Sequence, residues 1–304
     1  MSIVVAGHSG LVGSAIFKAL QNRNESVIGL NSKVVNLLDR KATFEFILDV
    51  KPEVVIDAAA VVGGIGANDS FPVDFLSKNL QIQSNLMDAS HAAEVERFVF
   101  LGSSCIYPRD CQQPIKEEYL LTGPLEKTNS AYAVAKIAGI ELIKSYRKQF
   151  EHKWISLMPT NMYGPGDNFD PEKGHVLPAL INKFVTARIK GLSKVTLWGT
   201  GIPRREFLHS RDLASAVIVA MEKYNEEIHL NVGTGTDISI QELALKIANF
   251  AGFNGEIEWD TSRPDGTPRK VLDISRLQKL NWAPSIGLEE GISETIHWFE
   301  AQNN

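Results

Sequence analysis

Apolar and polar positions follow two regular patterns over the first half of the chain. Short, almost continuous apolar runs lie at residues 2–6, 26–30, 52–64 and 97–104, and they are typical of strands that a parallel sheet covers on both faces. Between these runs, apolar residues recur at the spacing of amphipathic helices, most regularly over 79–93. This alternation predicts an α/β fold, a doubly wound parallel sheet of the Rossmann type.

A helix over 130–150 and the strand WISLMPTNMYGP complete this pattern, after which prolines interrupt shorter elements. We therefore expect a Rossmann domain over 1–162 and a smaller mixed α/β substrate domain over 163–304. Segments near 207–233 are expected to return to the first domain. The second domain is predicted to contain strands near 195–198 and 256–259 and helices near 175–190, 239–252 and 286–300.

A glycine-rich turn, GHSGLVG, follows the first strand and precedes the helical segment SAIFKAL. A strand, a tight glycine turn and a helix can bind the pyrophosphate of a dinucleotide against backbone N–H groups at the helix N-terminus. The spacing is GxxGxxG rather than GxGxxG, and a plain tight turn would also explain it. The place of the turn after the first strand favours a dinucleotide site, with contacts from Gly7, Ser9, Gly10, Leu11, Val12 and Gly13.

The residues after the second strand bear on the choice of cofactor. An acidic residue at this place selects NAD, whereas Lys or Arg favours the 2′-phosphate of NADP. The chain has Asn31, Ser32 and Lys33 and no acid. We therefore predict NADP with Lys33 as the phosphate partner, although a solvated surface lysine is an almost equally simple explanation.

Reactive side chains gather in the stretch from Leu101 to Lys136. Tyr132 and Lys136 are four residues apart in a predicted helix, so both side chains leave the same face. A nearby ammonium lowers the pKa of a phenol, which would make Tyr132 a proton donor and acceptor near neutral pH. Ser103 lies at the end of a predicted strand, where ligands of doubly wound sheets bind. Together these residues predict a site that acts on a carbonyl, whose oxygen Ser103 hydrogen-bonds.

Cys105 and His175 are weaker candidates when taken from the residues alone. A cysteine is most often a small buried apolar residue, but Cys105 lies two positions after Ser103, near enough to serve as acid or base on a carbon beside the carbonyl. His175 is by default a capping or surface histidine. Trp198 and basic residues of the second domain could bind a diphosphate and stack on a base; the basic residues are Lys183, Arg204, Arg205, Arg269 and Lys270.

Composition narrows the classes of function. The net charge is −5 and no basic run occurs, which argues against a nucleic-acid partner. The longest apolar region, 54–67, is broken by Asp57 and by glycines, so we predict no membrane span and no targeting segment. Two cysteines and seven scattered histidines match no metal-binding spacing, so we predict no metal. A cytoplasmic enzyme with a small-molecule substrate fits best.

Several motifs together resemble the GDP-L-fucose synthase family of extended short-chain dehydrogenases/reductases. They are GHSGLVGSAI, NLLD, DAAAVVGGIGAN, FLGSSCIYP, YAVAKIAGIELIKSY, MPTNMYGPGDNF, HVLPALI, REFLHSRDLA, NVGTG and PDGTPRK. The resemblance covers essentially the whole chain. SSCIYP and PDGTPRK are far more specific than GxxGxxG or YxxxK, which the whole superfamily shares.

The resemblance implies an enzyme that exchanges protons at carbons 3 and 5 of GDP-4-keto-6-deoxy-D-mannose and then reduces carbon 4 with NADPH. It assigns the proton exchange to Cys105 and His175 and the reduction to Ser103, Tyr132 and Lys136. The substrate contacts fall on Lys183, Trp198, Arg205, Asp265 and Lys270. Beyond the glycine turn, the expected cofactor contacts are Ser32, Lys33, Asn36, Leu37, Leu101, Gly102, Ser104, Lys136, Pro159, Thr160, Asn161, Met162 and His175.

One departure from the family concerns the cofactor. Arginines that hold the 2′-phosphate in the family are replaced here by Ser9 and Ser32. Lys33 could substitute for them, or the enzyme could accept NADH. We predict a modest preference for NADPH.

Three further expectations accompany the resemblance. Family members typically dimerise through two helices of the first domain, here 79–93 and 130–150, so we expect a homodimer. A reductase or epimerase of another GDP-4-keto sugar, such as a heptose, would use the same fold and catalytic set. A non-catalytic nucleotide sensor is the third interpretation, but such proteins commonly lose the tyrosine and lysine that this chain keeps.

Overall fold

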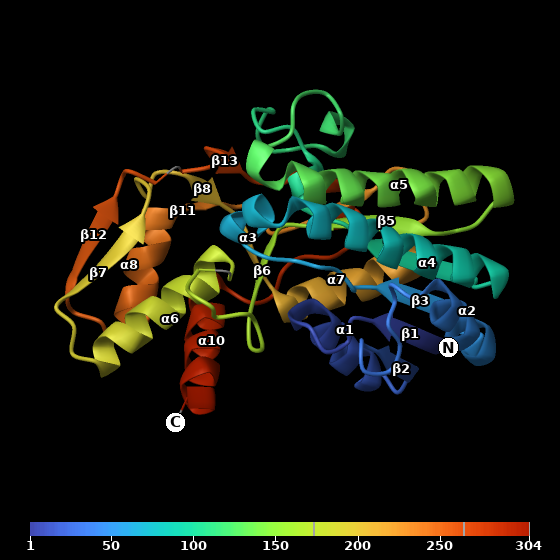
Figure 1. Ribbon diagram of the computed structural model, residues 1–304, viewed down its shortest axis with the longest axis horizontal. Helices are drawn as coiled ribbons and strands as arrows, with labels where there is room; N and C mark the ends of the chain where they lie inside the picture. Colours follow the sequence, from blue (N-terminus) through green and yellow to red (C-terminus); the bar gives the residue numbers. More distant parts are fainter. Residues whose placement is uncertain (173, 264, 304) are drawn as a thin grey trace.

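A computed structural model describes residues 1–172, 174–263 and 265–303 and contains a six-stranded central sheet (Figure 1). Every strand pairs in parallel with its neighbours, in the order β2-β1-β3-β4-β5-β10. The predicted doubly wound parallel sheet is therefore confirmed. The strands are β1 (Ser2–Ala6), β2 (Ser26–Leu30), β3 (Val54–Asp57), β4 (Arg97–Leu101), β5 (Ile155–Pro159) and β10 (Leu230–Val232).

Helices cover both faces of this sheet, because successive strand residues point to opposite sides. Val5 packs into a core with α1 and α7, whereas Val4 packs into a second core with α2, α4 and α5. Both faces are apolar, which explains why the strands are nearly continuous apolar runs. These helices are α1 (Leu11–Gln21), α2 (Arg40–Val50), α4 (Asn79–Ala92), α5 (Ser130–Phe150) and α7 (Ser210–Lys223).

The third strand is shorter than predicted. The sequence pattern extends the strand through residue 64, whereas β3 ends at Asp57. Beyond it the Asp57 carboxylate accepts a hydrogen bond from the Ala59 N–H, and both backbone polar groups of Val61 bond to the Asn79 side chain. A side chain thus takes the place of a neighbouring strand, and the apolar run leaves the sheet.

The smaller lobe lies at the carboxyl end of the sheet (Figure 1). Its apolar core gathers residues of α6, α8 and α10, including Phe184 and Ile247. The predicted strands near 195–198 and 256–259 are present and pair in parallel as β7 and β12. The elements of this part are α6 (Val176–Ile189), β7 (Lys194–Trp198), β8 (Arg204–Arg205), β11 (Ile238–Ser239), α8 (Ile240–Phe250), β12 (Glu256–Asp260), β13 (Arg269–Lys270) and α10 (Leu288–Asn303).

Shorter elements connect the two parts. The remaining α-helices and strands are α3 (Ile65–Ser70), β6 (Asn161–Tyr163), β9 (Phe207–His209) and α9 (Ser275–Gln278). β6 pairs with β9, and the chain then passes through α7 and β10, both of which pack on or in the central sheet. The division of the chain into domains at residue 162 stays a prediction.

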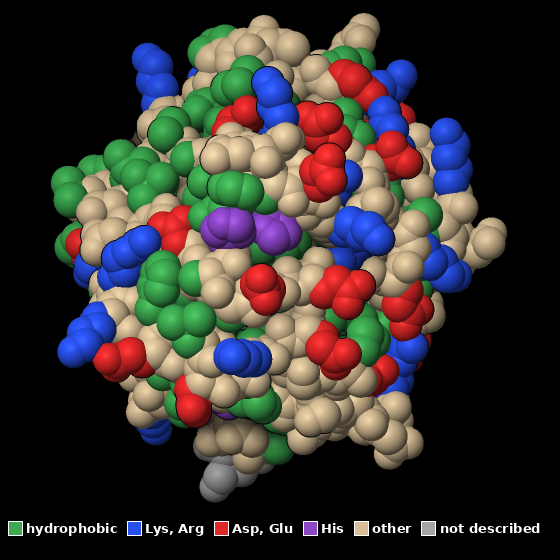
Figure 2. Space-filling model, turned by 90° about the vertical axis from the view of Figure 1, so that its right-hand side faces the viewer, with side chains coloured by type: hydrophobic (Ala, Val, Ile, Leu, Met, Phe, Trp, Pro, Cys, Tyr) green, Lys and Arg blue, Asp and Glu red, His purple; other side chains and the backbone are tan. Residues whose placement is uncertain are grey.

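The surface carries charges of both signs. On the face shown in Figure 2, Lys and Arg side chains are interspersed with Asp and Glu, in keeping with the small net charge of −5. In the described part of the chain, no helix has the length and apolar character needed to cross a membrane.

Candidate active site

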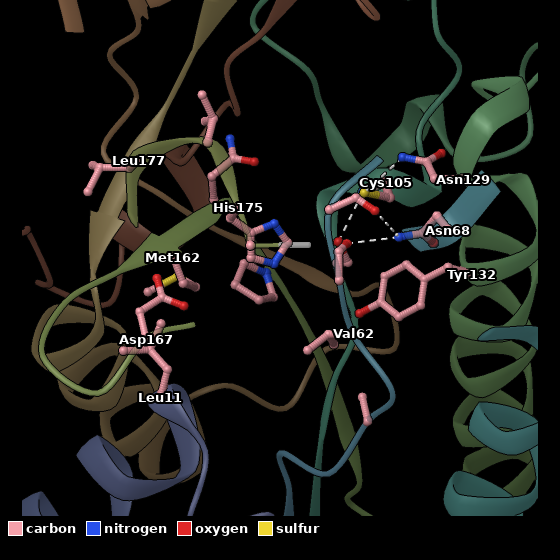
Figure 3. A pocket seen from close by; sticks show the side chains of 18 of the residues that line it. Leu11, Val62, Asn68, Cys105, Asn129, Tyr132, Met162, Asp167, His175 and Leu177 are labelled. Carbon is pink, nitrogen blue, oxygen red and sulfur yellow. Dashed lines mark hydrogen bonds between the residues drawn. The ribbon is translucent and has the colours of Figure 1, made fainter. Parts of the chain in front are cut away.

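A cleft of about 830 Å³ opens between the carboxyl ends of the central strands and the smaller lobe. Its position is the one expected for ligands in doubly wound sheets. All but one of the predicted cofactor, catalytic and substrate residues line it; the exception is Lys33. Figure 3 shows two walls of the cleft, with His175 on one side and Cys105 and Tyr132 on the other.

The glycine turn has the shape that a dinucleotide requires. Gly7 adopts a φ of +79°, and a Cβ atom there would lie 2.6 Å from the Ala58 carbonyl oxygen. Gly10 precedes α1, and no side chain caps the first turn of that helix. Backbone N–H groups at this helix N-terminus therefore face the cleft without a side-chain competitor, which fits the pyrophosphate of a dinucleotide.

The turn after β2 sets the region where a 2′-phosphate would lie. The Asn31 side chain accepts hydrogen bonds from the N–H groups of Lys33 and Val34, at 2.9 and 3.2 Å. This turn leaves Ser32 on the cleft wall and Lys33 outside the lining. The role of Lys33 as the phosphate partner stays a prediction.

Ser103, Tyr132 and Lys136 meet at the end of β4. Ser103 precedes a short 3₁₀ turn and accepts a hydrogen bond from the Cys105 N–H at 3.2 Å. Lys136 is buried beneath Tyr132, with its ammonium 5.9 Å from the centre of the phenol ring. The ammonium donates to the Leu101 carbonyl at 3.0 Å. The four-residue spacing therefore places both side chains on one face of α5, as predicted.

The predicted pKa of Tyr132 is wrong for the structure without ligands. Burial raises the pKa of the phenol well above its ordinary value, negative charge at Cys105 and Asp57 raises it further, and a hydrogen bond with Ser103 acts in the opposite direction. Tyr132 is half-buried in the cleft wall, and the sequence pattern could not reveal how much solvent its surroundings remove from the phenol. Tyr132 is thus held as a neutral phenol, which is the form that donates a proton.

The sulfur of Cys105 is surrounded by hydrogen-bond donors. The side-chain amide of Asn129 points at the sulfur from 3.4 Å, and the ammonium of Lys270 lies 3.8 Å away. Both donors stabilise negative charge on the sulfur, which a cysteine needs in order to remove a proton.

His175 approaches from the opposite wall. It is the residue before α6, and its side chain caps no backbone N–H group. The residue is exposed to the open cleft, while loss of solvent around the ring lowers the pKa of the imidazole, which favours the neutral form that can accept a proton. Cys105 and His175 therefore face the cleft from two sides (Figure 3).

The far end of the cleft presents an exposed aromatic ring. Trp198 is 51% exposed, and the cationic groups of Lys183 and Arg263 lie 5.4 and 5.1 Å from the ring centre. Asp265 accepts hydrogen bonds from the backbone N–H and the hydroxyl of Thr200, at 2.7 and 2.8 Å. An aromatic face, flanking cations and a carboxylate suit a purine base and its phosphates.

Two further cations, Arg205 and Lys270, line the cleft near Cys105. They are paired across β8 and β13, and Lys270 contacts Cys105. Burial lowers the pKa of Arg205, while negative charge at Cys105 raises it. Two cations at this place could hold the diphosphate next to the sugar.

Sequence reasoning missed three residues that line or flank the site. Asp57 ends β3, Asn129 precedes α5, and Asp167 lines the cleft with a buried Oδ2 atom that has no hydrogen-bond partner among the described residues. The position of Asp57 at the end of a central strand is a usable signal. Asn129, by contrast, is indistinguishable from an ordinary residue before a helix.

Metal ions in proteins are usually held by clusters of acidic, histidine and cysteine side chains. Within residues 1–172, 174–263 and 265–303, no three such side chains gather in an arrangement that could hold a metal ion. Both cysteines are free thiols.

Comparisons with known proteins identify the family of this chain. Residues 3–233 match the model of the NAD dependent epimerase/dehydratase family. The GDP-L-fucose synthase of Sinorhizobium fredii is 48% identical over 297 residues, covering 98% of this chain and 95% of the relative. The solved structure of a GDP-6-OMe-4-keto-L-xylo-heptose reductase from C. jejuni is similar, with a TM-score of 0.93 and 35% identity over 99% of this chain and 98% of that chain. A GDP-L-fucose synthetase from Naegleria fowleri bound to NADP is also similar, with a TM-score of 0.91 and 30% identity over 99% of this chain and 94% of that chain.

Proposed function

Because the chain belongs to the NAD dependent epimerase/dehydratase family and, within it, to the GDP-L-fucose synthases, we propose that it converts GDP-4-keto-6-deoxy-D-mannose into GDP-L-fucose. The reaction inverts carbons 3 and 5 and reduces carbon 4. One observation supports this proposal most directly: a single cleft gathers a carbonyl-reducing set and a second acid–base pair. These residues are Ser103, Tyr132 and Lys136 in the first group and Cys105 and His175 in the second.

Proton exchange depends on the 4-ketone of the substrate. The ketone acidifies the hydrogens on both flanking carbons, because the resulting charge spreads onto an oxygen that Ser103 and Tyr132 stabilise through hydrogen bonds. Inversion requires a proton to leave from one face and another to return to the opposite face. Cys105 and His175 reach the cleft from two walls, so they are suited to these two steps.

Reduction follows at carbon 4. Bound NADPH supplies the hydride. Tyr132 gives its phenol proton to the carbonyl oxygen, Ser103 orients that oxygen, and the ammonium of Lys136 stabilises the charge left on the tyrosine. Since burial holds Tyr132 as a neutral phenol, the proton is available when the reaction runs toward the alcohol.

We propose that the GDP part of the substrate lies toward Trp198. Its exposed ring offers a stacking surface for guanine, and Lys183 next to it supplies positive charge. Arg205 and Lys270 are then placed for the diphosphate, and Asp265 for a hydrogen bond to the nucleoside. Arginine and lysine are the usual partners of phosphate oxygens.

The cofactor is an NADP(H), in keeping with the NADP-bound relative. We propose only a modest preference over NADH, because Ser9 and Ser32 cannot form the ion pairs that arginines would offer the 2′-phosphate. Ser32 lines the cleft beside the adenosine end, so it can donate one hydrogen bond. Comparable catalytic efficiency with both cofactors, or better efficiency with NADH, would refute the preference.

The decisive assay supplies GDP-4-keto-6-deoxy-D-mannose and NADPH and identifies the product by NMR. GDP-L-fucose as the product supports the proposal. Absence of turnover, or reduction without inversion at carbons 3 and 5, contradicts it. A Tyr132→Phe sample serves as the control for contaminating reductases.

A second candidate is a reductase or epimerase of a GDP-heptose. The similarity to the C. jejuni heptose reductase favours it, since that structure superposes over 99% of this chain. The same assay with a GDP-4-keto-heptose distinguishes the two functions. Higher kcat/KM for the heptose would favour this second candidate.

We further propose that the protein is a cytoplasmic homodimer. The resemblance points to an interface of two helices, and α4 and α5 lie side by side at one edge of the molecule (Figure 1). Val134 of α5 is 46% exposed, which suits an interface contact. Light scattering of the purified protein measures its mass in solution, and Val134→Glu should convert the dimer into monomers. A wild-type mass in solution of 33.6 kDa, the mass of one chain, would refute the dimer.

A further inference from the structure

A buried carboxylate lies behind the reducing set. Asp57 ends β3 and is 1% exposed. Its Oδ1 atom accepts the Ala59 N–H at 3.1 Å, whereas its Oδ2 atom has no hydrogen-bond partner among the described residues. Burial of an incompletely bonded carboxylate is costly, so a further interaction is needed to keep it charged.

The side chain of Lys136 lies on the same face of the sheet as Asp57. Asp57 is aligned with Phe100 of β4, and side chains at aligned positions of neighbouring strands point to the same face. On that face the Lys136 ammonium lies 4.8 Å from the centre of the Phe100 ring and donates to the Leu101 carbonyl. The carboxylate and the ammonium therefore share one buried layer between the sheet and α5.

The electrostatic effects agree with this placement. Burial raises the pKa of Asp57 to about 6, and Lys136 lowers it. Burial lowers the pKa of Lys136, and Asp57 raises it. Asp57 also raises the pKa of Tyr132. The strand neighbours at its level are Ala6 and Phe100, both apolar, so the titratable groups coupled to Asp57 come from α5.

We propose that Asp57 is a positioning residue for the reduction: its carboxylate keeps the Lys136 ammonium charged and oriented, and keeps the Tyr132 phenol protonated until the substrate oxygen takes the proton. This proposal rests on the reductase activity proposed above. It assigns no contact with substrate to Asp57, which acts through its two neighbours on α5. A purely structural role for Asp57 would affect stability without changing how the rate depends on pH.

The first test compares the pH profiles of wild-type protein and Asp57→Asn, which removes the charge and keeps the shape. We expect kcat for reduction to fall about tenfold with little change in KM. The apparent pKa at which kcat falls on the alkaline side of the profile should decrease by about one pH unit. The decrease of kcat on the acidic side, which we expect near the Asp57 pKa of about 6, should disappear because asparagine does not titrate. Asp57→Glu should restore both limbs in part, and Asp49→Asn on the exposed surface of α2 is the matched control. Identical profiles for wild type and Asp57→Asn overturn the proposal.

The second test needs no turnover and therefore separates this proposal from the proposed substrate. Carboxyl ¹³C NMR of aspartate-labelled protein should contain one buried signal that is absent in Asp57→Asn and that titrates near pH 6. In Lys136→Met this signal should titrate at higher pH, because the ammonium no longer favours the carboxylate. A signal that does not respond to Lys136→Met excludes the pairing, even if the substrate assay succeeds. Failure of the substrate assay with a positive NMR result would count against the proposed activity alone.

Discussion

The ammonium of Lys270 lies 3.8 Å from the sulfur of Cys105, although 165 positions separate the two residues in the chain. Lys270 reaches this place because β13 pairs with β8 and aligns it with Arg205. The smaller lobe thus places a positive charge beside a thiol in the turn that follows β4 of the large sheet. The electrostatic environment of the Cys105 thiol therefore depends on how the two parts of the chain pack together.

Cys105→Ser should slow proton exchange at carbons 3 and 5 by about 10²- to 10⁴-fold, the usual contribution of a general base. Lys270→Met should slow it by about 10- to 100-fold, since one hydrogen bond to a charged group is lost. Deuterium incorporation from D₂O, followed by NMR, measures both effects. Cys111→Ser and Lys279→Met are the controls. Normal exchange in Cys105→Ser would mean that the thiol only fills space.

Tyr132→Phe should lose reduction while proton exchange continues at a lower rate. In the proposed reaction the phenol donates the proton at carbon 4, so its removal should lower kcat by about 10²- to 10⁴-fold. NADPH oxidation measured by absorbance tests the rate, and NADPH fluorescence tests whether the cofactor still binds. Tyr119→Phe removes a hydroxyl outside the cleft and serves as the control. Hydride transfer at the wild-type rate would remove Tyr132 from its role.

Ser32→Arg should increase the preference for NADPH over NADH by about 10- to 100-fold, because a guanidinium forms charge-assisted hydrogen bonds with the 2′-phosphate. Lys33→Ala should reduce the preference if Lys33 reaches that phosphate from outside the cleft lining. Ratios of kcat/KM for the two cofactors provide the measurement, and Lys41→Ala on the exposed face of α2 is the control. An unchanged ratio in both variants would place the 2′-phosphate elsewhere.

The reducing set could be predicted because its signals are local. Ser103 follows a strand, and Tyr132 and Lys136 obey the four-residue spacing of a helix. The contact between Lys270 and Cys105 could not be predicted from spacing, since it depends on strand pairing in another part of the fold. Family resemblance placed both residues near the substrate but gave no distance between them.

The environment of Tyr132 could not be predicted for a different reason. Electrostatic effects depend on burial and on neighbours that lie far away in sequence. Asp57 lies in an apolar run that is typical of a continuous strand. The structure ends β3 at Asp57 and aligns Asp57 with Phe100, on the face of the sheet that α5 covers. The sequence therefore predicted which side chains line the cleft, but not the effect of their surroundings on the pKa of Tyr132.

Glu206→Gln should destabilise the protein. Glu206 is fully buried, and its carboxylate accepts the N–H groups of Gly235 and Leu272 at 2.6 and 2.9 Å. A glutamine would turn its own NH₂ group toward one of these donors, at a cost of about 2–3 kcal/mol. Urea denaturation measures the stability, and Glu226→Gln, an exposed change, is the control. If Glu206→Gln unfolds at the same urea concentration as the wild type, the backbone around residue 206 accommodates the amide without loss of stability.

Asp57 makes the stability of the protein depend on pH. Its pKa rises from 3.8 to about 6 on folding, so the folded state binds the proton more tightly than the unfolded state. The stability gained in this way is fully present below pH 3.8 and is lost as the pH rises through about 6. Between acidic and neutral pH, the free energy of unfolding of Asp57→Asn should therefore rise relative to that of the wild type by up to about 3 kcal/mol. Urea denaturation at several pH values tests this, with Asp49→Asn as the control. A constant difference between wild type and Asp57→Asn across this range would mean that the pKa of Asp57 is the same in the folded and unfolded states, so that Lys136 fully offsets the effect of burial.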